Sequence, residues 1–167
     1  MHALVLGALL AIDPLHSSAQ FSVEHIFVER VAGTVPILRG SIDVRDGSRV
    51  PLRVSAQLDA AHLQTGDPDR DASLRSPDWF DTNDFPAWSF ESTKIVPAAD
   101  GFVMAGALTI HGVAQTENVN VVVSGTTARP HYTGTCRVDR HAFGMKIDRL
   151  DPVIGNTVEV TLDIAVK

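Results

Sequence analysis

The sequence predicts an all-β domain of eight antiparallel strands with one or two short helices. Apolar residues recur at every second position in eight separate segments, which is the pattern of strands with one buried face. Most of these segments are joined by short connections, and short connections favour antiparallel neighbours. The 167 residues are 44% hydrophobic and 20% charged, and no low-complexity linker divides them, so we expect one folded domain.

The eight expected strands are defined by this alternation. They lie at residues 19–23, 34–44, 52–58, 88–90, 102–110, 119–123, 132–138 and 158–166. The last strand carries the longest apolar stripe, which runs from Val158 to Val166 opposite a row of polar residues. Turns are indicated by glycine-containing dipeptides at residues 46–47, 100–101 and 111–112.

Residues 60–86 break the alternation and form an insertion between the third and fourth strands. Within it, Asp67-Pro68 has the pattern of a helix N-cap followed by proline at the first helical position, so a short helix through about Arg75 is expected. Ser76-Pro77 repeats this start signal. A second irregular stretch, residues 25–30, is expected to form one helical turn. The insertion also concentrates the negative charge, through Asp67, Asp69, Asp71, Asp78, Asp81 and Asp84.

The first twelve residues are apolar and contain neither Lys nor Arg. They resemble the apolar part of an export signal, but the basic start is missing, and cleavage after Ala11 would leave Leu9 where a small residue is expected. We therefore expect residues 1–11 to form a first strand or short helix ahead of a domain spanning residues 12–167. A truncated export signal is the alternative. No segment is long and apolar enough for a transmembrane helix.

Charge and residue content argue against several classes of function. The chain has 14 Lys and Arg against 20 Asp and Glu, a net charge of −6, whereas nucleic-acid binders usually present a basic surface. Cys136 is the only cysteine, so the chain has no internal disulfide, and we expect this side chain to point inward. The seven histidines lack metal-binding spacing, and no catalytic motif is present, so we expect neither a metal site nor catalytic residues.

Eight antiparallel strands have two common architectures, a sandwich of two sheets and a closed barrel. Composition and alternation do not separate them. A closed barrel of eight strands is wide enough to hold one small ligand, and one parity of every strand would then line its interior.

A series of short motifs runs along the chain in a fixed order. They occupy residues 12–18, 21–25, 65–66, 70–81, 85–86, 90–93, 108–113, 139–144 and 154–158. Each motif is weak alone, but together they span residues 12–167 and resemble the YceI-like family. Ser73 stands where that family commonly has histidine, and Trp79 stands where it commonly has phenylalanine. The change at Ser73 puts the family's head-group preference in doubt.

The resemblance implies a lipocalin-like antiparallel barrel with helices at one end. It also implies a tunnel through the barrel that binds a long apolar chain: a polyisoprenoid, an isoprenoid quinone or a fatty-acid amide. Members of the family are often homodimers and are often exported, so the resemblance implies a periplasmic or secreted protein. It implies no cofactor other than the bound lipophilic ligand.

The candidate tunnel residues are large apolar side chains, because each methylene that leaves water for an apolar wall gains about 0.8 kcal/mol. They are Phe21, Phe80, Phe85, Trp88, Phe90, Met104 and Phe143. The alternative is that these side chains belong to a filled core. Since the densest aromatic stretch borders the insertion at residues 60–86, we expect the ligand entrance there.

The candidate residues of a polar mouth lie mostly at strand ends or in the insertion. They are His16, Ser17, His25, Arg70, Asp71, Arg75, His111 and Arg140. Arginine suits a diphosphate because its guanidinium donates two parallel hydrogen bonds, whereas histidine or serine suits a quinone carbonyl or an amide. The alternative is that these residues only cap helices and brace turns.

We therefore expect a non-enzymatic protein that carries or stores a long-chain isoprenoid or acyl lipid in an apolar tunnel. Two alternatives remain open from the sequence. One is a small enzyme of the isomerase or cyclase type that acts on a hydrophobic substrate in the same cavity. The other is a stress-response module with a filled core and no ligand.

Overall fold

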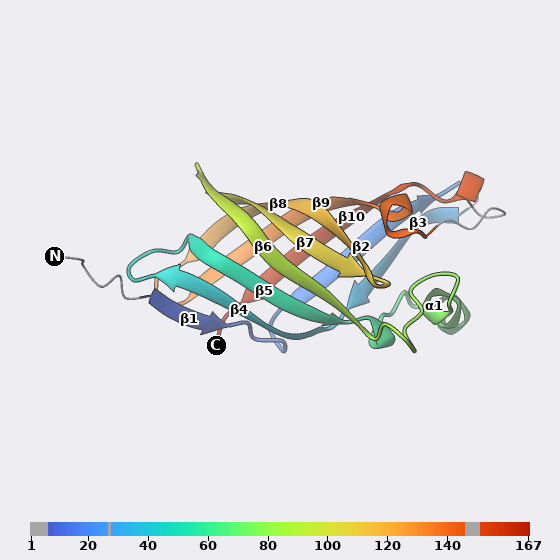
Figure 1. Cartoon of the computed structure of the whole chain (residues 1–167), viewed down its shortest axis with the longest axis horizontal. Helices are drawn as coiled ribbons and strands as arrows, with labels where there is room; N and C mark the ends of the chain where they lie inside the picture. The colour runs from blue at the N-terminus through green and yellow to red at the C-terminus, as the bar shows by residue number, and fades with distance from the viewer. Residues whose placement is uncertain (1–6, 27, 146–150) are drawn as a thin grey trace.

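The computed structural model describes residues 7–26, 28–145 and 151–167, and it confirms the all-β prediction. Ten strands form one antiparallel sheet in the order β1-β4-β5-β6-β7-β8-β9-β10-β2-β3. Figure 1 shows the strands running obliquely around an elongated barrel, with α1 at one end and β1 towards the other. The strands are β1 Gly7–Ala11, β2 Ser18–His25, β3 Val28–Val35, β4 Ile37–Arg45, β5 Pro51–Asp59, β6 Ala87–Ala98, β7 Gly101–Ile110, β8 Val113–Gly125, β9 Pro130–Asp139 and β10 Thr157–Ala165.

The count differs from eight for two reasons. The expected strand at residues 34–44 belongs to a longer path that changes partners at Pro36: β3 pairs with β2, whereas β4 pairs with β5 and β1. Proline has no N–H to offer a ladder, which suits a point where one pairing ends and another begins. The second reason is β1, which confirms a strand rather than a helix over residues 7–11.

Backbone hydrogen bonds link each edge strand of the sheet, β1 and β3, to a segment on the other side of the barrel. Near β1, the amide of Asp13 donates to the carbonyl of Ala165 (2.9 Å), and the amide of Lys167 donates to that of Ala11 (3.0 Å). On the α1 side, Thr34 and Gln64 exchange two backbone hydrogen bonds of 2.8 and 3.0 Å. These bonds help to hold one sheet in a curled, barrel-like form, whereas a sandwich would consist of two sheets.

The predicted helix is confirmed as α1, Pro68–Arg75, and the Asp67 side chain caps it by accepting from the amides of Asp69 and Arg70. The prediction of a second helix start at Ser76-Pro77 is wrong, because residues 76–80 form a bend and turns. Within the described residues there are also three short 3-10 helices: η1 Ala60–His62, η2 Arg140–Phe143 and η3 Asp151–Val153.

The expectation of a helical turn at residues 25–30 is also wrong. β2 continues to His25 and β3 begins at Val28, so the chain makes a hairpin there, with a shift of register between Val23 and His25. Apolar and polar residues still alternate weakly in this segment, and pairing between β2 and β3 outweighs the local tendency to form a helical turn. Residues 1–6 and 27 lie outside the described residues, as does the stretch 146–150.

Buried apolar side chains form two clusters inside the barrel. One contains Phe102, Met104 and Tyr132, and the other contains Trp79 and Trp88. Leu58 and Cys136 pack against both clusters, so the two are continuous. Among the described residues, no helix has the length and apolar character needed to cross a membrane.

Candidate functional site

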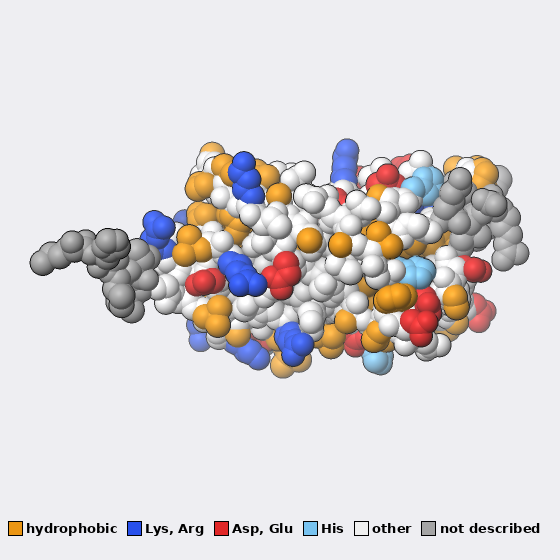
Figure 2. All heavy atoms as spheres, in the orientation of Figure 1, with side chains coloured by type: hydrophobic (Ala, Val, Ile, Leu, Met, Phe, Trp, Pro, Cys, Tyr) orange, Lys and Arg blue, Asp and Glu red, His pale blue; other side chains and the backbone are white. Residues whose placement is uncertain are grey.

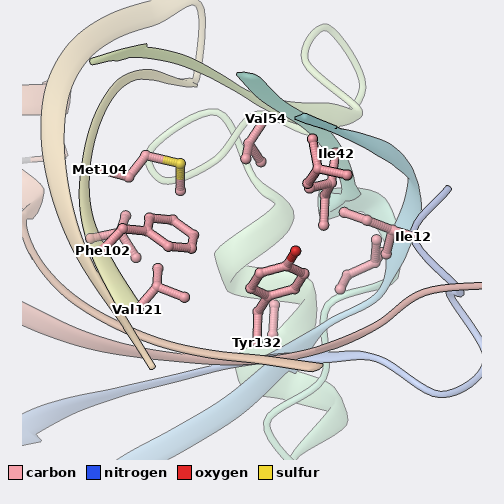
Figure 3. Close-up of a cluster of buried hydrophobic side chains, with 11 residues drawn as sticks. Ile12, Ile42, Val54, Phe102, Met104, Val121 and Tyr132 are labelled. Carbon is pink, nitrogen blue, oxygen red and sulfur yellow. The ribbon is translucent and has the colours of Figure 1, made fainter. Parts of the chain in front are cut away.

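The interior of the barrel contains a cavity of about 420 Å³ that reaches both apolar clusters. Every strand from β2 to β10 contributes lining residues. Four successive inward positions of β10, from Val158 to Ile164, line it, which corresponds to roughly 20 Å of extended strand. Figure 3 shows labelled side chains such as Met104, Val121 and Tyr132 pointing inward from the strands around this space. The shape is therefore that of an elongated apolar tunnel.

Five of the seven predicted tunnel residues line this cavity: Phe21, Phe80, Trp88, Phe90 and Met104. The other two do not. Phe85 packs on the ring of His111, with centroids 5.3 Å apart, and lies over the turn at Gly112. Phe143, in η2, is 1% exposed within the cluster near α1 and is not among the residues that line the cavity. Whether the five contact a ligand stays a prediction.

Two of the lining aromatics lie over glycines of the neighbouring strand. A Cβ placed on Gly33 would stand 2.5 Å from the Phe21 ring, and one placed on Gly106 would stand 2.2 Å from the Phe90 ring. The missing side chains let both rings lie close to the barrel wall. Glycine in these strands therefore keeps space open inside the barrel.

Three of the eight predicted mouth residues line the cavity: His25, Arg70 and Arg140. Arg140 is 3% exposed, and its guanidinium donates to the carbonyl oxygens of Met145 (2.7 Å), Gly155 (2.9 Å) and Ile154 (3.0 Å). This side chain ties η2 to the segment before β10. These hydrogen bonds link separate segments at this end of the barrel.

Arg70, Asp71 and Arg75 fasten α1 to the loop before it. Arg70 donates to the hydroxyl and the carbonyl of Thr65, both at 2.8 Å, while the buried Asp71 accepts from the amide and hydroxyl of that residue (2.8 and 2.6 Å). Arg75 donates to the carbonyl of Leu63 at 2.8 Å. Asp71 and Arg75 therefore fit the alternative that the predicted mouth residues only brace turns. Arg70 both braces the loop and lines the cavity.

The remaining predicted mouth residues are not brought to the cavity. His16 and Ser17 lie at the end near β1: His16 contacts Asp13 at 2.7 Å and thereby lowers the pKa of that carboxyl, and Ser17 bonds the backbone of Ala165. His111 occupies the turn after β7, with its Nε2 4.0 Å from the carboxylate of Asp81. The predicted mouth therefore divides between the two ends of the barrel.

Sequence reasoning missed Glu117 as a lining residue. It shares its parity in β8 with the buried Val119 and Val121, and all three line the cavity. The alternation that identified the two valines as inward-facing also applies to Glu117. It was missed because it lies before the apolar run begins. Ser73 also lines the cavity, so the departure from the family pattern lies in the site.

Burial governs the ionisation of the groups inside the barrel. It raises the pKa of the Tyr132 hydroxyl to about 12, and this hydroxyl donates to the carbonyl of Arg49 at 2.8 Å. It also raises the pKa of the Cys136 thiol to about 11 and, with a smaller contribution from the charge of Asp139, raises the pKa of Glu117. The interior thus disfavours charge, and Cys136 is a weak nucleophile at neutral pH.

The raised pKa of Glu117 predicts a pH-dependent effect of Glu117→Gln on stability. The folded state binds this proton more tightly than the unfolded chain does, so ionisation destabilises the wild type as pH rises above the ordinary value of 4.5. Relative to its effect at pH 4, the substitution should stabilise the fold at pH 8 by about 0.5 kcal/mol, a small effect because the side chain is only half-buried and solvent screens its charge. Urea denaturation followed by circular dichroism measures this difference. An effect of the substitution that is the same at both pH values would contradict the prediction.

Comparison with known proteins shows which family the chain resembles over most of its length. The family model for the YceI-like domain matches residues 10–166. A UPF0312 protein of Vibrio parahaemolyticus is 26% identical over 177 residues, covering 99% of this chain and 90% of its own length. A second UPF0312 protein, from Photorhabdus laumondii, is 27% identical over 128 residues, covering 77% of this chain and 67% of its own length.

Two solved structures share the fold. The Burkholderia cenocepacia protein BcnA superposes with a TM-score of 0.78 at 20% identity, covering 93% of this chain and 99% of its own. A polyisoprenoid-binding domain from Saccharophagus degradans, described as implicated in plant cell wall breakdown, superposes with a TM-score of 0.74 at 17% identity. That alignment covers 95% of this chain and 97% of the other.

Proposed function

The chain belongs to the YceI-like family, and on that premise we propose that it binds one long-chain isoprenoid or related lipid in its barrel and carries or stores it. The observation that carries the proposal is the elongated apolar cavity, which a filled core would not contain. A chain of ten buried methylenes would gain about 8 kcal/mol from transfer out of water, before the entropic cost of binding. Tight binding therefore requires few polar contacts.

The chemistry of the lining favours a binding protein over an enzyme. The guanidinium of Arg140 donates to three carbonyl oxygens, and the Tyr132 hydroxyl donates to a fourth. The raised pKa of Cys136 disfavours its thiolate. Arg140 and Tyr132 are thus held in structural roles and Cys136 is a weak nucleophile, so none of these three groups is free to exchange protons or attack a substrate.

The entrance fits best beside α1. Arg70 and Ser73 of α1 line the cavity, together with His25 at the end of β2, so polar lining gathers at this end. The opposite end is occupied by the buried Tyr132, whose hydroxyl is tied to the loop between β4 and β5. A chain would enter with its apolar end first and leave its head group towards α1. The homodimer and export of the protein remain predictions.

Protection of Cys136 tests the proposal, because the only cysteine of the chain lines the cavity. We expect geranylgeraniol to slow alkylation of Cys136 by N-ethylmaleimide at pH 8.5 by about tenfold or more, because a bound chain occupies the space that the reagent must enter. Mass spectrometry of the modified protein measures the rate.

The matched control moves the thiol by one position, in the double variant Cys136→Ala and Thr135→Cys. Thr135 is exposed on the outer face of β9, so its replacement should react equally fast with and without the lipid. Equal rates for Cys136 itself in the presence and absence of saturating lipid would refute binding in this cavity.

A further inference from the structure

Glu117 places a carboxyl group in an otherwise apolar part of the tunnel. Gly106 lies opposite it on β7 and has no side chain, and the next inward residues along β8 are Val119 and Val121. The pairing of β8 with β9 begins only at Val119, so Glu117 lies where these two strands separate. The Phe90 ring lies over Gly106, so the carboxyl group faces apolar walls on the cavity side.

No described residue hydrogen-bonds or ion-pairs with Glu117, and no other carboxylate is among the described residues that line the cavity. The two charged residues where β9 meets η2 do not neutralise the negative charge of Glu117. Asp139 repels it, and the guanidinium of Arg140 is directed to three backbone carbonyls. Glu117 is half-buried and lines the cavity without a partner among the described residues, so its carboxyl group is available to a hydrogen-bond donor on a ligand.

We propose that Glu117 is a specificity-determining residue that selects chains with an uncharged, hydrogen-bond-donating head, a hydroxyl or a carboxamide, over chains that end in a carboxylate or phosphate. The inference rests on the proposed function, and it names the head group that the tunnel accepts. An O–H or N–H donor forms a charge-assisted hydrogen bond with the carboxylate, whereas an anionic head meets a like charge in a poorly solvated space.

The exterior of the barrel favours the same selection. Asp67, Asp69, Asp78 and Asp84 are exposed around α1, where polar residues line the cavity. Figure 2 shows acidic and histidine side chains towards this end of the molecule, whereas most Lys and Arg lie towards the opposite end on the face in view. An anionic chain would therefore approach against a field of its own sign.

The test compares three molecules that share one chain and differ only in the head: farnesol, farnesyl methyl ether and farnesoate. Trp79 and Trp88, the two tryptophans of the chain, both line the cavity, so quenching of their fluorescence at pH 8.5 reports binding. The wild type should bind farnesol about tenfold or more tightly than the ether, which has no donor, or than the anion.

Two variants separate the contributions of Glu117. Glu117→Gln should strengthen farnesoate binding about tenfold, because the like charge is gone, and Glu117→Leu should make farnesol and its methyl ether equal. Both variants should retain binding of the ether, which shows that they are folded. The matched control is Glu91→Gln, which removes an exposed carboxylate of β6 that lies 3.3 Å from Arg53, and it should change none of the three affinities.

The outcomes distinguish this inference from the proposed function. Equal binding of the three molecules by the wild type, or unchanged farnesoate binding by Glu117→Gln, overturns the role of Glu117 and leaves a tunnel that binds chains of any head. If none of the three binds to the wild type, the proposed function and this inference both fail.

Discussion

Replacing Gly134 with leucine is expected to weaken binding of a long apolar chain by about a hundredfold. Gly134 lines the cavity from the middle of β9, and a Cβ there would lie 3.2 Å from Val119 and 3.3 Å from Leu162. Both neighbours are side-chain atoms that can shift by a few tenths of an ångström. The four carbons of the leucine side chain would displace about four chain methylenes, worth roughly 3 kcal/mol. Titration of tryptophan fluorescence with geranylgeraniol measures the loss.

The neighbouring residue supplies the control for this experiment. Thr135 is exposed and points away from the cavity, so Thr135→Leu adds the same side chain to the outer face of the same strand. It should bind the lipid as the wild type does. If Gly134→Leu is folded and also binds geranylgeraniol with the wild-type affinity, the chain does not occupy the middle of the barrel.

Replacing Arg140 with methionine is expected to lower the free energy of unfolding by about 3 kcal/mol or more. Methionine keeps much of the apolar length, but three carbonyl oxygens at the end of the barrel lose a charged donor. Hydrogen bonds to charged groups contribute about 1.5–3 kcal/mol each, and unpaired buried carbonyls add a further cost. Urea denaturation followed by circular dichroism measures the change.

Arg137 is the matched control for Arg140. Its side chain is 79% exposed on β9, and it lies 3.9 Å from Glu159. Arg137→Met should change the free energy of unfolding by less than about 0.5 kcal/mol. A similarly small effect of Arg140→Met would show that its hydrogen bonds do not hold the end of the barrel, and would restore the interpretation of this arginine as a head-group ligand.

The sequence allowed most of the fold to be predicted because one face of nearly every strand is buried. The stripe from Val158 to Val166 and the glycine turn at residues 111–112 were identified correctly because alternation and turn chemistry are local properties. The change of partners at Pro36 could not be predicted in this way. It depends on which strands meet when the sheet curls, and that is a property of the whole barrel.

The candidate site was less predictable, for the same physical reason. Phe90 and Phe143 are equally apolar, yet Phe90 lines the cavity, whereas Phe143 of η2 is buried in the cluster that contains Trp79 and Trp88. The difference depends on features distant in sequence, such as Gly106, which gives the Phe90 ring its place. Arg140 similarly donates to carbonyls as many as 15 residues away, which no local pattern encodes. Glu117, by contrast, could have been predicted to face the interior, because it lies two residues before Val119 and so shares its face of β8.

Native mass spectrometry can show whether the barrel encloses one long apolar chain. The wild-type protein is purified under mild conditions, or stripped of lipid and then exposed to geranylgeraniol, and its mass is compared with that of the bare chain of 18.0 kDa. We expect one retained molecule per barrel, with a mass of a few hundred daltons, that is extractable into organic solvent. A protein that is empty as purified and takes up neither prenyl nor acyl chains would contradict it.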